Sequence, residues 1–405
     1  MMLLRLAWRN IWRNSRRSVI ILTSVTVGIV ATVLTDALNR GMVFQMLNNQ
    51  IGSHVSHIQI HRSGFNDNPV IQSTLPQSVD VDSVVRSVAG IEQFTRRVVT
   101  FGILSSASSS SGISIIGIDP PKEAGITTIK SSVVQGSYLS GDPREIIVGT
   151  KLAEKLGVGV GDKLVAMASA VDGHIGSDVF RIVGLYETFS SEFDKAFVYV
   201  PLADAQQLVA IGNRASEIAI IVHSRDELQR IQTRLRDELG ADFEVLSYAE
   251  ILPLLVMTVE MYDQMMVIFY AMIGIAVIFG IINTMLMSVF ERIREFGVLK
   301  AIGMKNRPLF AMIMIEAFYL GAIGTGIGFV LSLALYVPLA ETGVDLSMFS
   351  DGLRSFGVGA VIYPVMTAGV VVNALVVVPV VALLGAIYPA VKAVRLEPMS
   401  AIRYV

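Results

Sequence analysis

The stretch ERIREFGVLKAIGMKNRP, residues 291–308, is a charged, basic segment between two long apolar runs. Its apolar residues recur at near-helical spacing, at positions Ile293, Phe296, Val298, Leu299 and Ile302. This spacing predicts a short amphipathic helix, which Gly303 would end because glycine readily adopts the left-handed conformation that follows many helices. Such a helix either lies on lipid headgroups or docks on a protein, and the pattern alone allows both.

Four segments are long and apolar enough to cross a membrane, which takes roughly 20 predominantly apolar residues for about 30 Å of hydrocarbon. The first covers about 18–34 and the second about 267–289, while the third lies within 309–339 and the fourth within 367–388. No convincing small-x-small cleavage site follows the first apolar core, so we expect an uncleaved anchor rather than a signal peptide. The chain of 405 residues is therefore predicted to be a membrane protein.

Lysine and arginine flank these segments unevenly. Arginines and no acidic residue precede the first segment, and a second basic group lies in 291–308. The loop between the third and fourth segments instead carries Glu341, Asp345 and Asp351. Because basic loops stay in the cytoplasm, we expect both termini and the 291–308 stretch to be cytoplasmic, and the segment 40–262 to lie outside.

The composition argues against several classes of function. Hydrophobic residues make up 53% and charged residues 16% of the chain, against about 25% charged in average soluble domains. The net charge of −2 argues against a nucleic-acid binder, and the absence of cysteine excludes disulfides and thiol catalysis. The sequence also lacks a phosphate-binding loop, a zinc-binding H-E-x-x-H helix and a G-x-S-x-G elbow. We therefore predict no catalytic residue, no metal site and no bound cofactor.

The segment 40–262 alternates helix and strand patterns. Residues 79–104 indicate an amphipathic helix, a glycine stop and a strand, and residues 217–248 indicate a strand, a helix and a second strand. The portion between them is richer in strands, and only 152–156 and 202–209 have a helical pattern. The sequence therefore predicts an α+β domain with a β-rich insertion.

Two kinds of side chain in or near the apolar segments have alternative explanations. Glu316 lies inside the third segment, where an acid either faces the bundle interior with a function or lies near the cytoplasmic face and pairs with a basic residue. Met257, Met261, Met265 and Met266 precede the second segment. Their flexible thioethers suit a surface that accepts varied apolar partners, but a helix packed against its neighbours has the same pattern. The sequence leaves both alternatives open.

His54, His57 and His61 lie close together in the sequence HVSHIQIH. In a strand, His57 and His61 would share a face about 13 Å apart, which is too far for one metal ion. The usual carboxylate or cysteine companions of a metal site are also missing. We expect partly exposed histidines at the neck of the outer domain rather than a metal site.

From Glu291 to Gly303 the opening stretch fits the motif E-R-x-R-E-[IF]-G-[VL]-x-[KR]-A-[IL]-G residue by residue, and so resembles the coupling helix of the MacB/FtsX superfamily of ABC-transporter permeases. The segments LAWRNIWRNSRRS, GIDP, IIVGTKLAEKLGVGVGDKL and YPAVKAVRLEPMSAIR also resemble family signatures. The resemblance implies an α-helical membrane protein with four transmembrane helices plus a large α+β extracytoplasmic (periplasmic) domain with a β-rich insertion. It further implies residues that dock on an ATPase, namely Glu291, Arg292, Arg294, Glu295, Phe296, Gly297, Val298, Lys300, Ala301 and Gly303.

This layout divides the chain into regions. A cytoplasmic helix and the first span with its extension would occupy 1–50, and the periplasmic domain 51–262. Within that domain, porter-like flanks would cover about 51–111 and 214–262, and the β-rich insertion about 112–213. The rest would be the second transmembrane helix (263–290), the coupling helix and its loop (291–308), the third helix (309–339), a short periplasmic loop (340–366), and the fourth helix with a cytoplasmic tail (367–405).

The resemblance also implies partners in a bacterial inner membrane. A cytoplasmic ABC ATPase dimer would bind and use ATP and Mg²⁺, because this chain lacks a phosphate loop. A second permease, either identical or a sister chain, would complete the unit. Membrane lipid surrounds it, and no nucleic acid is expected.

Residues 41–61 and 180–209 resemble the lipoprotein-releasing (LolC/LolE-type) permeases of this superfamily. In those proteins lipid-modified cargo enters a cavity between the first and second spans and passes to a periplasmic carrier. The candidate cavity residues here are Asp36, Asn39, Met261, Met265, Met266 and Phe269. The hairpin at 167–180 is short and lacks the prolines expected of a carrier-recruiting extension, so recruitment of a carrier by this chain is left open.

We therefore expect a permease that extracts lipoproteins, or related lipidated cargo, from the outer leaflet of the inner membrane for delivery towards the outer membrane. Two alternatives from the same superfamily remain. Mechanotransmission to an outer enzyme is less favoured, because such relays usually have much smaller outer domains. Tripartite efflux of antibiotics or peptides is less favoured because this chain lacks a fused ATPase. It remains an alternative because some relatives use a separate ATPase.

Overall fold

The computed structural model describes residues 2–13, 15–67, 73–355 and 357–396. The chain divides into two compact units. The first, called here the membrane unit, comprises Met1–Val43, Val259–Asp345 and Val361–Val405, and the second, the outer unit, comprises Phe44–Thr258 and Leu346–Ala360.

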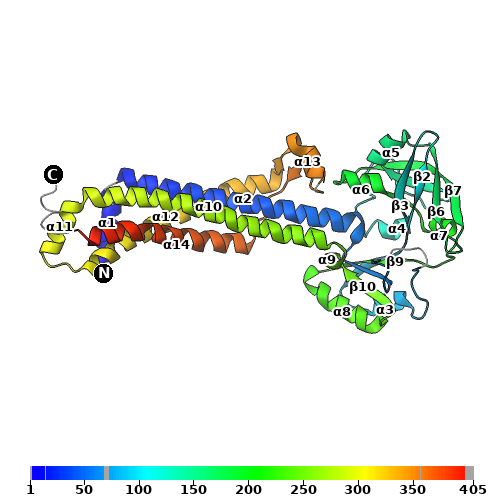
Figure 1. Cartoon of the computed structure of the whole chain (residues 1–405), viewed down its shortest axis with the longest axis horizontal. Coiled ribbons are helices and arrows are strands. Elements are labelled where there is room, and N and C mark those ends of the chain that lie inside the picture. Colours follow the sequence, from blue (N-terminus) through cyan, green and yellow to red (C-terminus); the bar gives the residue numbers. More distant parts are fainter. Residues whose placement is uncertain (1, 14, 68–72, 356, 397–405) are drawn as a thin grey trace. The chain divides into compact units, whose positions relative to one another are not determined.

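Within the described residues, four helices are long and apolar enough to cross a membrane, as the hydropathy pattern predicts (Figure 1). They are α2 (Ser15–Gln50), α10 (Pro253–Glu291), α12 (Asn306–Thr342) and α14 (Ala368–Val394). The helices extend past the apolar segments; α10, for example, begins at Pro253 rather than at 263. Hydropathy marks only the part suited to lipid, whereas polar helix formers such as Glu260 and Gln264 prolong the helix beyond it.

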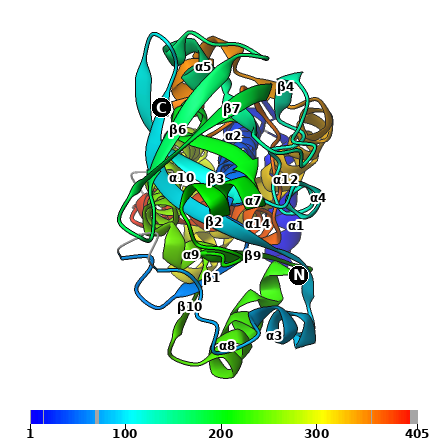
Figure 2. The ribbon, with the colours of Figure 1, turned by 90° about the vertical axis from the view of Figure 1, so that its right-hand side faces the viewer.

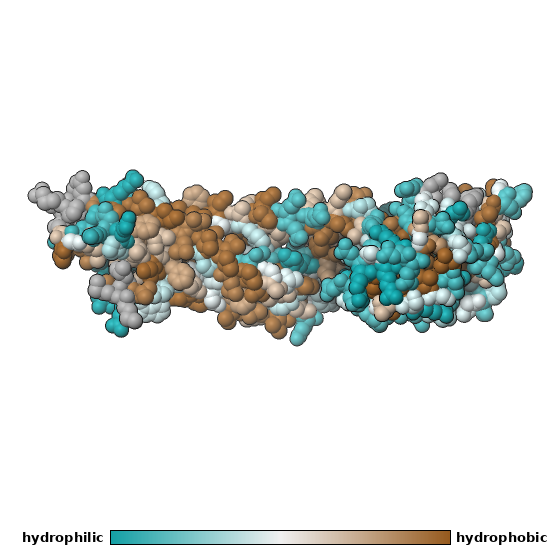
Figure 3. All heavy atoms as spheres, turned by 90° about the horizontal axis from the view of Figure 1, so that it is seen from below, coloured by the Kyte–Doolittle hydropathy of each residue, from teal (hydrophilic) through white to brown (hydrophobic). Residues whose placement is uncertain are grey.

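Apolar side chains cover much of the outer surface of these helices (Figure 3). Val267 and Phe279 of α10 and Val330 of α12 are among the exposed large hydrophobic residues. In a water-soluble protein such a surface would be buried, but lipid tails solvate it without penalty. The exposed apolar surface therefore agrees with a membrane-spanning unit.

Glycines on α12 allow it to approach α2 closely. A Cβ atom on Gly324 would lie 2.8 Å from Cγ1 of Val25, and one on Gly328 would lie 2.8 Å from Cβ of Ile29. These separations are shorter than van der Waals contact, so a larger residue would push the helices apart. By contrast, a Cβ atom on Gly326 would meet no atom of the described structure within 4 Å.

We predict opposite effects for two neighbouring alanine substitutions. Gly324→Ala should destabilise the membrane unit by about 1–3 kcal/mol through overpacking, whereas Gly326→Ala should be neutral or stabilising by up to about 1 kcal/mol through helix propensity. Thermal unfolding of the purified chain in detergent measures both. Equal melting temperatures for the two variants would contradict the close crossing of α2 and α12.

Among the described residues of the outer unit, ten strands form one sheet in the order β10-β1-β9-β2-β3-β8-β5-β7-β4, with β6 paired to β2 and β7 (Figure 2). The strands are β1 (Ile58–Arg62), β2 (Ile91–Ser105), β3 (Ser110–Ile118), β4 (Val133–Gly136), β5 (Glu145–Gly149), β6 (Lys163–Ser169), β7 (Ile175–Tyr186), β8 (Phe197–Pro201), β9 (Glu217–Val222) and β10 (Phe243–Ser247). The sheet mixes parallel pairs, such as β3 with β8, and antiparallel pairs, such as β2 with β3.

One part of this sheet carries the helices α3 (Val81–Ser87) and α8 (Leu228–Leu239). Residues 79–104 fold as α3 and β2, and residues 217–248 as β9, α8 and β10, which confirms the predicted order of elements. Ile220 of β9 and Leu235 of α8 belong to the hydrophobic cluster that joins the helices to the strands.

The β-rich part carries α5 (Thr150–Leu156) and α7 (Leu202–Leu208), both of which the sequence predicted. It also contains α4 (Pro120–Glu123) and α6 (Ser191–Ala196), which the prediction missed. Both helices span less than two turns, too few to show a helical repeat of apolar residues. The remaining short elements are the π-helix Ile51–Val55, the 3₁₀ helices Arg225–Glu227 and Ser347–Phe349, α9 (Tyr248–Ile251), α13 (Ser350–Ser355), β11 (Val344–Asp345) and β12 (Val361–Ile362).

The strand β2 belongs to both parts of the sheet. Its first half, from Ile91 to Arg97, pairs with β9, and its second half pairs with β3 from Arg97 and with β6 from Gly102. The predicted start of the insertion at 112 falls inside β3, so the strand-rich part begins earlier, within β2. A strand of 15 residues extends over roughly 50 Å, and it can therefore serve two groups of neighbours in one sheet.

Arg97 of β2 lies at the centre of a buried network of charges. Its guanidinium donates to Glu123 over 2.7 and 3.0 Å, to Glu217 over 2.7 Å, and to the carbonyl oxygen of His54 over 2.6 Å. His61 is buried beside them, with its Nε2 atom 3.8 Å from Glu217. The expectation of a partly exposed histidine is therefore wrong for His61, because the sheet covers it, whereas His54 and His57 are partly buried.

Burial lowers the pKa of His61 below its ordinary value, although Glu217 opposes the shift. As pH falls through about 6.5, the unfolded chain gains a proton that the folded chain resists. The contribution of neutral His61 to the free energy of unfolding is therefore full above about pH 6.5. It is lost as pH falls through the lowered pKa of the folded chain.

We predict that His61→Gln weakens the acid sensitivity of the outer unit. The stability lost between pH 7 and pH 5 should be smaller in this variant than in the unsubstituted chain. Denaturant-dependent hydrogen exchange of β9 amides, corrected for intrinsic exchange rates, measures this difference. The exposed His223→Gln is the matched control and should leave the loss unchanged; an equal loss in all three proteins would contradict the assignment to His61.

Candidate functional site

The opening stretch forms α11 (Ile293–Ala301), which confirms the predicted short helix. Arg292 separates it from α10, and a loop containing Gly303 separates it from α12. The φ angle of Gly303 is +101°, a conformation that glycine adopts without strain. The chain therefore changes direction on both sides of α11, which presents the helix at the end of two spans.

The apolar positions of this stretch do not share one face, contrary to the prediction. Ile293 and Phe296 are buried, whereas Val298 is exposed and Ile302 is 79% exposed. At about 100° per residue, Val298 lies about 140° around the helix from Ile293, so the two cannot face the same neighbour. The stretch therefore has a buried inner face and a separate exposed apolar patch, defined by Val298 and Ile302.

Arg292 and Glu316 form an ion pair that fixes the inner face. The Nη1 atom of Arg292 lies 3.1 Å from Oε2 of Glu316, and both side chains are more than nine-tenths buried. The guanidinium carbon of Arg292 also lies 4.9 Å from the centre of the Phe296 ring, which is a favourable cation–π distance. Glu316 is therefore buried in the bundle, as the first interpretation expects, and pairs with a basic residue of the predicted coupling motif, as the second expects.

Glu295 extends the pair to α1 (Met2–Arg13). The Nη2 atom of Arg13 donates to both carboxylate oxygens of Glu295 over 2.6 and 2.7 Å, and Nε of Arg292 lies 3.3 Å from the same carboxylate. Burial alone would raise the pKa of Glu295, but Arg13 and Arg292 hold it below its ordinary value. Glu295 is therefore ionised at neutral pH and links two arginines.

Lys300 joins α11 to the end of α14. Its ammonium group donates to the carbonyl oxygens of Val394 over 2.8 Å and of Leu396 over 2.7 Å. Carbonyls at the end of a helix lack partners within the helix, and a nearby cation satisfies them. The helix α11 is therefore connected by charged side chains to α1, α12 and the end of α14.

An open hollow of about 480 Å³ lies beside α11 in the membrane unit. Its walls come from α1, from the region of α11, and from α12: Leu6, Arg9, Asn10, Arg13, Arg292, Arg294, Glu295, Val298, Leu299 and Met312. Val298 thus connects the exposed apolar patch to a hollow with several basic residues. This combination suits a protein surface with apolar and acidic side chains.

The predicted coupling residues fall into two groups. Glu291, Arg294, Glu295, Val298, Ala301 and Gly303 are exposed, whereas Arg292, Phe296 and Gly297 are buried and Lys300 is partly buried. The exposed side chains can touch a partner. Arg292, Glu295 and Lys300 hold the helix in place through their ion pairs and hydrogen bonds. The sequence did not predict that Arg13 binds Glu295. It only placed Arg13 among the basic residues that precede the first span.

The candidate cargo residues differ in how much of each side chain is exposed, so they do not form one surface. Met261 and Met265 are exposed on α10, Met266 is buried, and Asn39 and Phe269 are partly buried. Met265 and Met266 are adjacent, so about 100° of helix rotation separates their side chains.

Asp36 of α2 is buried and has polar neighbours instead. Its Oδ1 atom lies 3.2 Å from Nε of Arg40, one helical turn further along α2. The sequence had not singled out Arg40 as its partner. The structure therefore places Asp36 in an ion pair within one predicted span.

Comparison with known families identifies the chain. Residues 18–238 match the family described as MacB-like periplasmic core domain, and residues 267–398 match the family described as FtsX-like permease C-terminal. The chain belongs to the MacB/FtsX superfamily of ABC-transporter permeases. It is a multi-pass membrane protein with a MacB-like periplasmic domain.

Individual relatives are distant. The chain is 26% identical to the pyoverdine export ATP-binding/permease protein PvdT of Pseudomonas fluorescens over 98% of its own length and 58% of the relative's length. It is 22% identical to the lipoprotein-releasing system transmembrane protein LolC of Xylella fastidiosa over 71% of its own length and 72% of the relative's length. Among solved structures, the extracellular domain of the noncanonic ABC-type transporter YknZ matches 47% of this chain and 100% of that domain, with 18% identity and a TM-score of 0.34.

We predict that the buried ion pair fixes α11. Arg292→Ala should destabilise the packing of α11 by about 3–5 kcal/mol, because it leaves Glu316 buried without its cation. Arg294→Ala, a neighbouring exposed arginine, is the matched control and should change stability by no more than about 0.5 kcal/mol. Hydrogen exchange of α11 amides in detergent measures both.

The partner charge offers a second test of the same pair. Adding Glu316→Gln to Arg292→Ala should restore part of the lost protection, because the unpaired buried charge is removed. Equal exchange in the two arginine variants, or no recovery in the double variant, would contradict a stabilising role of this pair.

Proposed function

We propose that this chain is the transmembrane permease subunit through which a separate cytoplasmic ABC ATPase drives the extraction of lipoproteins, or related lipidated cargo, from the outer leaflet of the inner membrane towards the outer membrane. The observation that carries the ATPase part is the division of the 291–308 stretch into a fixed inner face and an exposed apolar patch. A large exposed apolar side chain such as Ile302 is favoured where a protein partner covers it. ATP and Mg²⁺ are used by the partner, and this chain binds no cofactor.

Coupling follows from the contacts of α11. A displacement of the helix by the ATPase reaches α12 through Arg292 and Glu316, and reaches α1 through Glu295 and Arg13. It reaches the end of α14 through Lys300. Because a buried ion pair strongly opposes separation, a push on α11 moves α12 with it. The exposed pair of Arg13 and Glu295 adds a weaker link to α1. In this proposal the termini and α11 face the cytoplasm, and the outer unit faces the periplasm.

Similarity to LolC supports the choice of a lipidated cargo. The exposed face of α10 supports it independently, since Met257, Met261, Met265 and Met272 are all exposed there. Methionine side chains adapt to irregular apolar partners, including acyl chains. A second permease, identical or a sister chain, would complete the cargo path along this face.

The hairpin of β6 and β7 does not support recruitment of a carrier by this chain. The two strands pair up to Ser169 and Ile175, so only a short turn joins them. In our proposal a periplasmic carrier is recruited by the partner permease.

Tripartite efflux of antibiotics or peptides is a second candidate, supported by the similarity to the pyoverdine export protein PvdT over nearly the whole of this chain. In that case the same coupling site would serve a tripartite pump. Mechanotransmission to an outer enzyme is a third form of the same coupling.

We predict that the exposed apolar patch binds the ATPase. The double variant Val298→Ser and Ile302→Ser should lose most of the ATPase that co-purifies with the chain, because it removes apolar contact area at the interface. Ile302→Val is the conservative control and should retain the ATPase. Quantitative mass spectrometry of the purified complex gives the ratio of ATPase to permease. An unchanged ratio in the double variant, with unchanged thermal stability, would remove the patch from the interface.

Mass spectrometry of all proteins that co-purify in mild detergent without added ATP tests the function itself. A stoichiometric ABC ATPase together with triacylated lipoproteins is the expected result. An ATPase with an efflux adaptor or a peptidoglycan enzyme, and without acylated cargo, would overturn the lipoprotein proposal in favour of efflux or mechanotransmission.

A further inference from the structure

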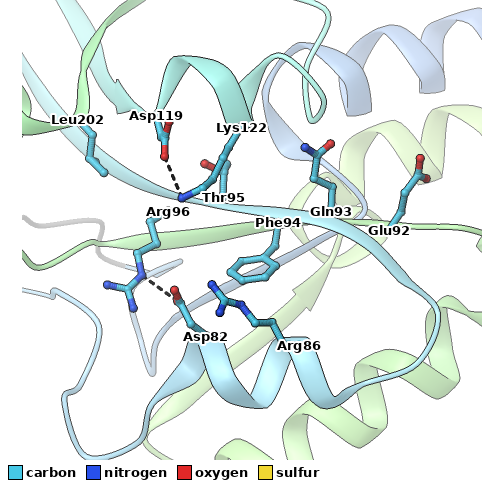
Figure 4. A pocket seen from close by; sticks show the side chains of 10 residues that line it. All are labelled: Asp82, Arg86, Glu92, Gln93, Phe94, Thr95, Arg96, Asp119, Lys122 and Leu202. Atoms are coloured by element: carbon cyan, nitrogen blue, oxygen red, sulfur yellow. Dashed lines mark hydrogen bonds and ion pairs between the residues drawn. The ribbon is translucent and has the colours of Figure 1, made fainter. Parts of the chain in front are cut away.

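The outer unit contains a cavity of about 330 Å³ beside the first half of β2 (Figure 4). The side chains that line it come from α3, β2, the start of α4 and the start of α7: Asp82, Arg86, Glu92, Gln93, Phe94, Thr95, Arg96, Asp119, Lys122 and Leu202. None of these residues belongs to the coupling site or to the candidate cargo residues.

The cavity follows the edge of β2 rather than one of its faces. Side chains of a strand point alternately to opposite faces, so a cavity on one face would be lined by every second residue. Here the consecutive residues 92–96 all line it. In Figure 4, Phe94 and Arg96 point towards α3, while Gln93 and Thr95 point to the opposite side.

That edge has no strand partner among the described residues. β2 pairs with β9 from Ile91 to Arg97, and its pairing with β3 on the other side begins only at Arg97. Between Ile91 and Arg96, the backbone groups that point away from β9 therefore have no strand to pair with in the described part of the chain. An unpaired edge of this kind is a template for an additional extended segment.

One cation in the cavity is free to bind a carboxylate. Arg96 pairs with Asp82 over 2.8 Å, and Lys122 pairs with Asp119 over 2.9 Å. Arg86 has no carboxylate of the described chain within 4.0 Å, and its guanidinium carbon lies 5.7 Å from the centre of the Phe94 ring. A guanidinium held over an aromatic ring keeps its N–H donors available for a carboxylate.

A second polar group in the cavity lacks a partner. Thr95 is only 1% exposed, and its hydroxyl oxygen has no hydrogen-bond partner in the described structure. A buried hydroxyl without a partner is unfavourable by about 1–3 kcal/mol. A ligand that supplied a hydrogen bond here would remove that penalty.

We propose that this site binds an extended peptide segment of another protein, which adds as a strand to the edge of β2 at residues 91–96. Peptide backbone pairs with the open edge, an acidic side chain of the segment binds Arg86, and a polar group on the opposite side reaches Thr95. The occupant is a polypeptide, because only a peptide backbone matches an unpaired strand edge along its length. This partner is additional to the ATPase and the cargo, and the inference does not depend on which cargo is carried.

The test uses the full chain in lipid nanodiscs and a fluorescein-labelled peptide of sequence SVEVST, with binding followed by fluorescence anisotropy. Saturable binding is expected. Arg86→Glu should weaken it by about tenfold or more, and Thr95→Val should weaken it by a smaller factor. Arg62→Glu, which changes an exposed arginine of β1 outside the cavity, is the matched control and should bind as the unsubstituted chain does.

Two altered peptides separate strand addition from simple charge attraction. A peptide with lysine in place of glutamate should bind about tenfold more weakly, and one with N-methyl groups on alternate amides should lose binding because it cannot pair with the strand. The proposal is overturned by an absence of saturable binding, by equal binding to the Arg86 and Arg62 variants, or by equal binding of the methylated peptide. None of these outcomes bears on co-purification of the ATPase or of lipoproteins, so the proposed function stands or fails separately.

Discussion

The buried pair between Arg292 and Glu316 is the interaction on which the arrangement of α11 depends. Each charge alone would be strongly unfavourable in a buried position, and together they are acceptable only at close range and in a fixed geometry. Arg292 lies between α10 and α11, while Glu316 lies on α12, so their contact at 3.1 Å fixes the loop against the third span. The aromatic face of Phe296 covers the same guanidinium, and the short helix is thereby held at a defined angle.

This constraint accounts for the charge of the stretch between two apolar runs. Glu295 accepts from Arg13 and lies beside Arg292, and Lys300 satisfies carbonyl groups at the end of α14. A loop held only by apolar contacts could slide on the helix bundle. Directional bonds to three different elements instead fix the position of α11, as the proposed coupling to an ATPase requires. The exposed patch of Val298 and Ile302 is then free to serve as the contact surface.

The sequence predicted helices and spans, whose apolar residues recur at short intervals. It did not predict contacts between residues that are far apart in the chain. Hydropathy located all four spans, and helical spacing located α3, α8 and α11. Pairs such as Arg13 with Glu295 come from opposite ends of the chain, and no local period can reveal them. The burial of His61 depends likewise on strands that are distant in sequence. The motif singled out residues around α11, but only the structure separates those with buried side chains from those with exposed ones.

The open edge of β2 also has a cause in the sequence. β3 ends at Ile118, and after Asp119 the chain continues with Pro120 and Pro121. Proline has no backbone N–H and cannot supply the ladder hydrogen bonds that would continue the strand. β3 therefore stops opposite Arg97, and the preceding residues of β2 are left without a strand partner on that side among the described residues. Exposed edges invite aggregation unless charged side chains guard them, and Glu92 and Arg96 provide such charges here. Because the edge is both created and guarded by particular residues, we regard it as a selective binding surface rather than an incomplete sheet.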